Sequence, residues 1–193
     1  MNKTRLEAFS DAVIAIVMTI MVLELRIPHG ADLESLGPLL PIFLSYVLSF
    51  VYLGIYWNNH HHMLQATHRV NGAILWANLH LLFWLSLVPF TTGWMGENHF
   101  APLPTAVYGI VLLAAAIAYT ILQQAIVRHQ TDEHRLLAEA VGSDLKGKIS
   151  ILFYVAAIPL AFVNQWISDA LYIGVAVIWL VPDRRIEKRI NES

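Results

Sequence analysis

Three charged residues near the start of this sequence are the first candidates for a chemical role. Arg5, Glu7 and Asp11 lie just before the uncharged, apolar run Ala12–Leu23. If that run crosses a membrane, each charge near its middle costs about 2.5–3.5 kcal/mol on insertion scales, so such residues are usually functional or paired. We interpret Glu7 as part of a solvated helix end. For Asp11 we expect a partner, which could be Arg5 of a neighbouring chain, a histidine, or a neutral hydroxyl or amide.

A run of three histidines, His60, His61 and His62, is the second candidate. Consecutive helical residues point about 100° apart, so the three imidazoles do not converge on one metal ion without ligands from elsewhere. We therefore predict no metal site here. We expect instead that one of these histidines, with Trp57 or Asn58 nearby, is a polar partner for the charged residues of the first helix.

The composition indicates that these residues belong to an integral membrane protein. Of 193 residues, 57% are hydrophobic and 13% are charged, against about 25% charged in soluble domains. The mean hydropathy is +0.57. The net charge of -2 gives no indication of nucleic-acid binding, and the absence of cysteine excludes disulfides and thiolate metal sites. No nucleophile–base pair or phosphate-binding loop stands out, so we predict that the protein is not an enzyme and carries no cofactor.

Stretches without charged residues predict six membrane-spanning helices in a single domain, residues 1–193. Pro89 and Pro159 fall inside spans and are expected to kink them. Of the 12 lysines and arginines, 11 lie on the side that holds both termini, and only Arg26 lies on the other. Basic residues concentrate in cytoplasmic segments, so both termini are predicted to be cytoplasmic. The predicted spans are 4–26, 38–62, 70–94, 103–127, 148–164 and 167–183.

The first span has an apolar stripe. Its members are spaced four, three, four and three residues apart, so they share one helix face: Phe9, Val13, Ile16, Ile20 and Leu23. At about 100° per residue, Thr19 lies about 60° from Ile16, whereas Asp11 lies about 140° away and Ser10 about 120° away on the other side. Periodicity alone leaves open whether the stripe packs in the bundle, contacts lipid or faces a symmetric partner.

Four residues of the first span carry a resemblance to a known family. Arg5, Phe9, Ser10 and Asp11 form the pattern R-x-x-x-F-S-D, followed by A-V-I-A-I-V-M-T. This resembles the signature of the transmembrane protein 175 family, which comprises endolysosomal potassium channels and their bacterial relatives. The length is similar to that of the bacterial type, with one six-span repeat per chain.

The resemblance implies an all-α membrane protein in which four chains surround a central pore lined by their first helices. It implies an apolar constriction at Ile16, with Ile20 and Leu23 further out, and a hydroxyl layer at Thr19 that favours potassium over sodium. Arg5, Phe9, Ser10 and Asp11 would then form a structural motif rather than ligate ions. The implied partners are other copies of the chain, the bilayer of the plasma membrane and permeant potassium.

Two other functions remain open from the residues alone. A secondary transporter or metal-ion exporter could use Asp11 and the histidines at the membrane end as ion ligands. An intramembrane enzyme or cofactor protein could be built on the same histidines.

Overall fold

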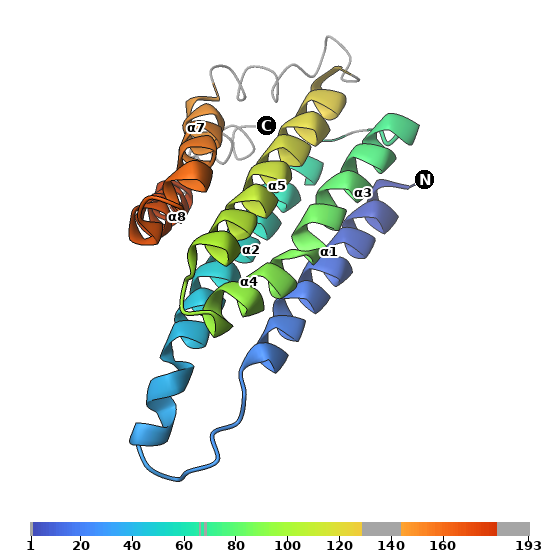
Figure 1. The fold of residues 1–193 in the computed structure, drawn as a ribbon. Helices are drawn as coiled ribbons and strands as arrows, with labels where there is room; N and C mark the ends of the chain where they lie inside the picture. The colour runs from blue at the N-terminus through green and yellow to red at the C-terminus, as the bar shows by residue number, and fades with distance from the viewer. Residues whose placement is uncertain (1, 66, 68, 129–143, 181–193) are drawn as a thin grey trace.

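The part of the chain that the structure describes is a bundle of helices and their connections, as Figure 1 shows. The structure is a computed structural model, and it describes residues 2–65, 67, 69–128 and 144–180. The helices follow in the order α1 (Lys3–Ile20), η1 (Met21–Glu24), η2 (Glu34–Leu39), α2 (Leu40–Gln65), α3 (Gly72–Ser86), α4 (Val88–Glu97), α5 (Pro102–Arg128), α7 (Leu145–Leu160) and α8 (Gln165–Leu180).

Four of these helical stretches are long and apolar enough to cross a membrane, and they correspond to the first four predicted spans. They are Lys3–Glu24, Glu34–Gln65, Gly72–Glu97 and Pro102–Arg128. The protein is therefore an all-α, multi-pass membrane protein, as predicted.

The last two predicted spans, 148–164 and 167–183, correspond to α7 and α8, and the described part of each is short for a membrane crossing. Each helix has 16 residues, which is about 24 Å of helix against a hydrocarbon core of roughly 30 Å. Asp144 begins α7 early, because its side chain accepts the backbone N–H of Gly147 at 2.9 Å and caps the helix. Pro159 lies one residue before the end of α7. The last predicted span also includes residues after 180, which lie outside the described residues.

Proline divides the third predicted span, as expected. α3 ends at Ser86, and α4 begins at Val88 with Pro89 in its first turn. Proline has no backbone N–H and clashes with the preceding turn, so a continuous helix is interrupted here. The hydroxyl of Thr92 donates to the carbonyl of Val88 at 2.6 Å, so a buried side chain supplies a hydrogen bond beside the break.

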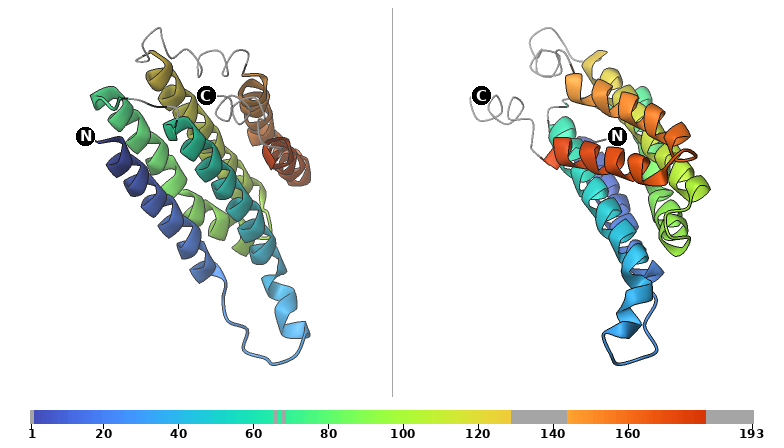
Figure 2. Two further views of the ribbon diagram at one scale, coloured as in Figure 1. Left: turned by 180° about the vertical axis from the view of Figure 1, so that it is seen from behind. Right: turned by 60° about the vertical axis from the view of Figure 1, so that its left-hand side comes forward.

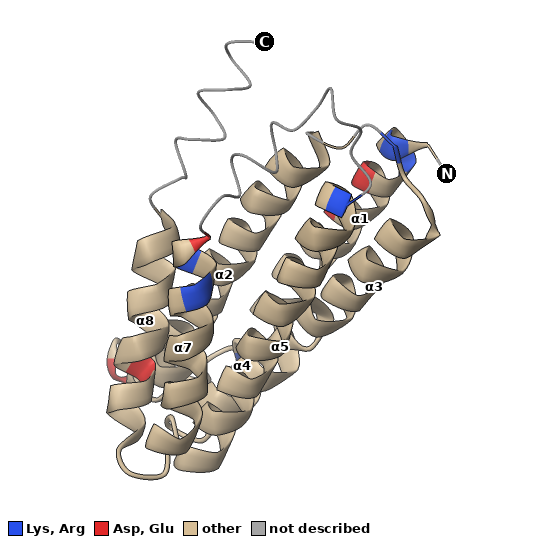
Figure 3. Ribbon diagram, turned by 90° about the horizontal axis from the view of Figure 1, so that it is seen from above, with Lys and Arg blue, Asp and Glu red and all other residues tan. Residues whose placement is uncertain are grey.

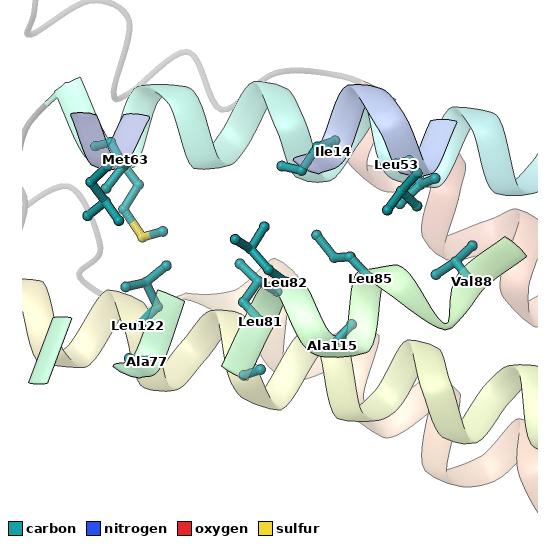
Figure 4. Packing of buried hydrophobic residues seen from close by; sticks show 14 of the residues in the cluster. Ile14, Leu53, Met63, Ala77, Leu81, Leu82, Leu85, Val88, Ala115 and Leu122 are labelled. Atoms are coloured by element: carbon teal, nitrogen blue, oxygen red, sulfur yellow. The ribbon is translucent and has the colours of Figure 1, made fainter. Parts of the chain in front are cut away.

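Two apolar clusters hold the helices together. The larger one joins α1, α2, α3 and α5, and Figure 4 shows part of it, with Ile14, Leu53 and Leu85 among its labelled members. The second cluster is rich in tyrosine and joins α2, α5, α7 and α8 around the fully buried Tyr108 and Tyr172. The α7–α8 hairpin is therefore attached by its own core, and Figure 2 shows α8 running across α2 rather than along it.

Charged residues gather at the ends of the helices, and most of the helical surface in Figure 3 is uncharged. The described lysines and arginines at the end that holds the start of α1 are Lys3, Arg5, Arg69, Arg128, Lys146 and Lys148, and Arg26 is at the opposite end. The remaining basic residues of the predicted cytoplasmic side, Arg135 and those in 184–189, lie outside the described residues.

Candidate pore helix

Helix α1 starts at a side-chain cap and runs for 18 residues before it gives way to a 3-10 helix. The side chain of Asn2 accepts the backbone N–H of Thr4 at 3.2 Å, which satisfies one of the free N–H groups of the first turn. The chain then continues as the 3-10 helix η1 to Glu24, whereas one helix to residue 26 was predicted.

Most of the apolar stripe of α1 faces away from the rest of the chain, and only Val13 packs against the larger cluster. Ile16 is 56% exposed, Ile20 is 44% and Leu23 is 77%. The opposite face packs into the larger cluster, and the buried residues there are Leu6, Ser10, Ile14 and Val17 of α1 and Met21 of η1. Ile16, Ile20 and Leu23 therefore do little to hold α1 in its own bundle, and within a membrane they face lipid, other copies of the chain or a water-filled passage.

Thr19 lies beside this stripe and is exposed. Its hydroxyl lies 3.0 Å from the carbonyl oxygen of Ala15 and 2.9 Å from that of Ile16. The single hydroxyl proton is therefore used within the helix, and the lone pairs of the oxygen remain available to a cation or to water.

The acidic residues of α1 have partners on α2, close to where the sequence analysis expected them. The indole N–H of Trp57 donates to Oδ1 of Asp11 at 3.1 Å. Oε1 of Glu7 lies 3.4 Å from Nδ1 of His61, which makes an ion pair when the imidazole is protonated. The interpretation of Glu7 as a solvated helix end was wrong, because its side chain is only 22% exposed.

Ser10 begins a buried chain of hydrogen bonds through three helices. Its hydroxyl donates to the carbonyl of Leu6 at 2.9 Å and accepts Nδ2 of Asn78 on α3 at 2.9 Å. Oδ1 of Asn78 lies 2.7 Å from Nε2 of His60 on α2. Because Oδ1 can only accept, Nε2 of His60 is the protonated nitrogen. Ser10, Asn78 and His60 are each 0% exposed, so this chain ties α1 to both neighbours inside the bundle.

The other two motif residues, Arg5 and Phe9, are exposed on the surface of the chain. Among the described residues, Arg5 takes part in no ion pair. The structure thus brings Ser10 and Asp11 together with α2 and α3, and it does not bring Arg5 and Phe9 to them.

Sequence reasoning missed the role of Asn78 as the bridge between Ser10 and His60. It also missed two contacts at the far end of α1. The Glu24 side chain covers Gly93 of α4, where a Cβ atom would lie 2.8 Å from Oε2 of Glu24, and Arg26 pairs with Glu97. Only the glycine gave a signal in the sequence, since glycine in a helix interior marks a close approach.

Within the described residues, no group of three or more histidine, aspartate or glutamate side chains is placed to hold a metal ion. The rings of His61 and His62 meet edge to face at 5.6 Å between centroids, and His60 points to Asn78. This arrangement gives no support to a metal exporter or a metalloenzyme.

Comparisons with known proteins agree with these features. The family described as the endosomal/lysosomal potassium channel TMEM175 matches residues 5–89, from α1 to the start of α4. A protein named as a potassium channel from a Chryseobacterium species is 56% identical over 193 residues, which is 100% of both chains. This chain belongs to the TMEM175 family. That family is described as an ion channel and not as an enzyme.

More distant TMEM175 relatives cover nearly the whole chain. A protein named as a potassium channel from Streptomyces collinus is 32% identical over 89% of each chain. A solved structure, titled as a lysosomal potassium-selective channel TMEM175 homologue from Chamaesiphon minutus, superposes with a TM-score of 0.79 at 28% identity. It covers 94% of this chain and 97% of that one.

Proposed function

We propose that this chain forms a potassium-selective, leaky cation channel in the plasma membrane, as a homotetramer whose pore is lined by α1. The observation that carries the proposal is the exposed apolar face of α1, which lies opposite the hydrogen bonds that fix the helix in its own bundle. Four such faces around an axis would bury one another and enclose a passage. The potassium-channel names of the relatives support the choice of ion.

In this proposal Ile16, Ile20 and Leu23 form successive apolar rings along the pore, narrowest at Ile16. Such a ring offers no oxygen to replace the water that an ion loses, so it forms a barrier, and apolar constrictions can close a pore by dewetting. Four Thr19 hydroxyls beside the Ile16 ring supply the oxygen lone pairs that the rings lack. Potassium holds its water less tightly than sodium, so a ring that forces partial dehydration favours potassium.

The motif residues act as scaffold in this proposal. Ser10 and Asp11 set the rotation of α1 through Asn78 and Trp57, and that rotation directs Ile16 at the axis. Arg5 is exposed at the start of α1 and is proposed to pair with a neighbouring chain. Both termini are proposed to lie in the cytoplasm, on the side of the described basic residues other than Arg26.

Reconstitution in planar bilayers tests the proposal. With unequal potassium chloride on the two sides we expect unitary currents that reverse close to the potassium equilibrium potential, and with sodium replacing potassium on one side we expect a shift of the reversal potential. Native mass spectrometry of the protein with retained lipid should give four chains. Saturable, coupled flux without unitary currents, or a stable monomer or dimer, would overturn it.

A further inference from the structure

One acidic side chain of α8 is buried without a partner among the described residues. Asp169 lies about one turn after the start of the helix at Gln165, and it is only 7% exposed. Both of its carboxyl oxygens are buried, and neither has a hydrogen-bond partner within the described part of the chain. An ionised carboxylate in such a place loses its water without gaining a replacement, whereas the neutral acid loses far less.

The hydroxyl groups beside Asp169 are already used elsewhere. The Ser168 hydroxyl donates to the carbonyl of Ala157 at 2.6 Å, and the Tyr172 hydroxyl donates to the carbonyl of Thr105 at 3.1 Å. Each hydroxyl has a single proton, so neither can also donate to Asp169. Hydrogen bonds to the charged form are what keep a buried carboxyl ionised, and these two neighbours do not supply them.

The start of α8 does not supply donors to Asp169 either. The free N–H groups of a helix belong to its first turn, and Asp169 follows that turn. One of these groups, the N–H of Trp166, is accepted by Oδ1 of Asn164 at 3.0 Å. The helix end is therefore capped by Asn164, and Asp169 does not act as its cap.

A counter-charge is also missing beside Asp169 in the described structure. The ring centroids of Trp166 and Phe100 are 5.7 Å apart, so the start of α8 lies at the end of the bundle that holds the α4–α5 turn. The described basic residue at that end, Arg26, is paired with Glu97. Neither of the ion pairs found among the described residues involves Asp169.

The other titratable side chains around this part of α8 are tyrosines. Helix α8 packs against α7, α2 and α5. The α7 ring of Tyr154 and the α5 ring of Tyr108 lie 6.3 Å and 5.6 Å from that of Tyr172, and Tyr52 of α2 donates to the carbonyl of Tyr172. Phenols are uncharged at neutral pH, so they cannot balance a negative charge on Asp169.

We propose that Asp169 is a proton-binding site, occupied in the folded protein at neutral pH, and that α8 packs on α5 with this carboxyl neutral. A proton is the ligand that the burial of both oxygens favours, because a hydrated metal ion or an organic cation needs space at the oxygens and a proton does not. The site lies on α8 and not on α1. Its protonation therefore does not depend on whether α1 lines a pore.

Infrared spectroscopy of the full chain, purified in a maltoside detergent, tests the protonation directly. A protonated carboxyl has a C=O stretching band that carboxylates lack, and ¹³C at the aspartate side-chain carboxyls separates the aspartate band from that of glutamate. At neutral pH we expect this band in the parent protein. We expect its loss in Asp169→Asn, which keeps the size of the side chain but cannot ionise.

The matched control is Asp32→Asn in the connection between η1 and η2. Asp32 is exposed, and hydrogen bonds from the hydroxyl and the backbone N–H of Ser35 lower the pKa of its carboxyl. Asp32 is therefore ionised at neutral pH, and its replacement should leave the protonated aspartate band unchanged.

Dicyclohexylcarbodiimide, an apolar reagent for protonated carboxyls in membranes, assigns the residue without a variant. The acid adds across one C=N bond, so the carboxyl oxygen bonds to the central carbon and the proton goes to one nitrogen. The acyl group then moves from oxygen to the other nitrogen, which gives a stable N-acylurea with no leaving group. Peptide mass spectrometry should find one added carbodiimide on Asp169 and none on Asp32, and labelling should decrease as the pH rises.

The two measurements separate the possible results. An aspartate band that disappears in Asp169→Asn supports the proposal, and if that variant fails to assemble, the carbodiimide adduct on Asp169 of the parent protein assigns the band. Absence of the band in the assembled parent protein, or an undiminished band in an assembled Asp169→Asn variant, overturns the proposal. Asp169 is then ionised, with a counter-charge from lipid, from another copy or from outside the described residues.

Discussion

The two faces of α1 differ in their contacts. The buried face carries Ser10 and Ile14, both 0% exposed, and through Ser10 it joins a hydrogen-bonded chain to Asn78 and His60. The exposed face carries Ile16 and Leu23, which are 56% and 77% exposed. Contacts within the chain fix the packing of the buried face. The exposed face has a function only through what it contacts outside the chain.

This division separates stability from permeation along a single helix. Substitutions on the buried face should change the free energy of unfolding, and substitutions on the exposed face should change ion flow in an intact protein. The following predictions test that separation.

The largest effect is expected at Asn78. Asn78→Leu keeps the size of the side chain but leaves the Nε2–H of His60 without an acceptor in a buried site, so the free energy of unfolding should fall by about 1–3 kcal/mol. Chemical or thermal unfolding in detergent, followed by circular dichroism, measures this change.

The matched variant replaces all three members of the chain, with Ser10→Ala and His60→Leu added to Asn78→Leu. Because no polar group then remains unpaired, much of the lost stability should return. A single Asn78→Leu variant as stable as the parent protein would show that the Ser10–Asn78–His60 chain does not fix α1.

The second effect concerns the bond between Asp11 and Trp57. Hydrogen bonds to charged groups contribute about 1.5–3 kcal/mol, and Asp11 is partly exposed, so the lower end applies. A double-mutant cycle with Asp11→Ala and Trp57→Phe should give a coupling energy of about 1.5 kcal/mol. Additive effects of the two substitutions would mean that the indole and the carboxylate stabilise the protein separately. Loss of ion flow in an Asp11→Ala variant of unchanged stability would favour an ion-binding role instead.

The sequence predicted well those features of the fold that depend on one helix at a time. Long uncharged runs identified the first four spans, and Pro89 identified the break between α3 and α4. The described boundaries of α7 and α8 lie within about four residues of the prediction, as for the other spans, but apolar runs do not show that Asp144 caps α7 or how α8 crosses α2.

For α1, the spacing of Ile16, Ile20 and Leu23 predicted a shared face, and the structure shows that this face is exposed. The partners of Ser10 and Asp11 were harder to predict from the sequence. A histidine or Trp57 could be expected as a partner because it lies at a similar depth in the membrane to the motif. The bridge through Asn78 depends on the rotation of α3, and no local sequence pattern encodes that rotation. The exposure of Arg5 likewise follows from the packing of α1 and not from its spacing to Asp11.

The third prediction concerns Ile16. Ile16→Asn should wet the proposed constriction, so unitary conductance should rise about tenfold, which corresponds to a barrier lowered by about 1.4 kcal/mol, and discrimination of potassium from sodium should fall. Single-channel recording in bilayers measures both.

Its control is Ile117→Asn on α5, where the isoleucine is 43% exposed but lies on another helix. Ile14 is unsuitable because it is fully buried in the core. Unchanged currents in an assembled Ile16→Asn channel, or equal changes in both variants, would show that α1 does not line the pore.

The smallest effect is expected at Thr19. Thr19→Val keeps the shape of the side chain but removes the oxygen whose lone pairs are left free by the hydrogen bonds to the carbonyls of Ala15 and Ile16. The Ile16 barrier remains, so conductance should change little, while the permeability ratio of potassium to sodium should fall about threefold, or about 0.6 kcal/mol. Reversal potentials under mixed potassium and sodium conditions measure the ratio. Thr120→Val is the matched control, since the Thr120 hydroxyl also donates to a carbonyl of its own helix, that of Ala116 at 2.9 Å, but on α5. If the two valine variants alter the ratio equally, the hydroxyl beside the exposed face has no special part in selectivity, and the preference for potassium must come from the apolar rings alone.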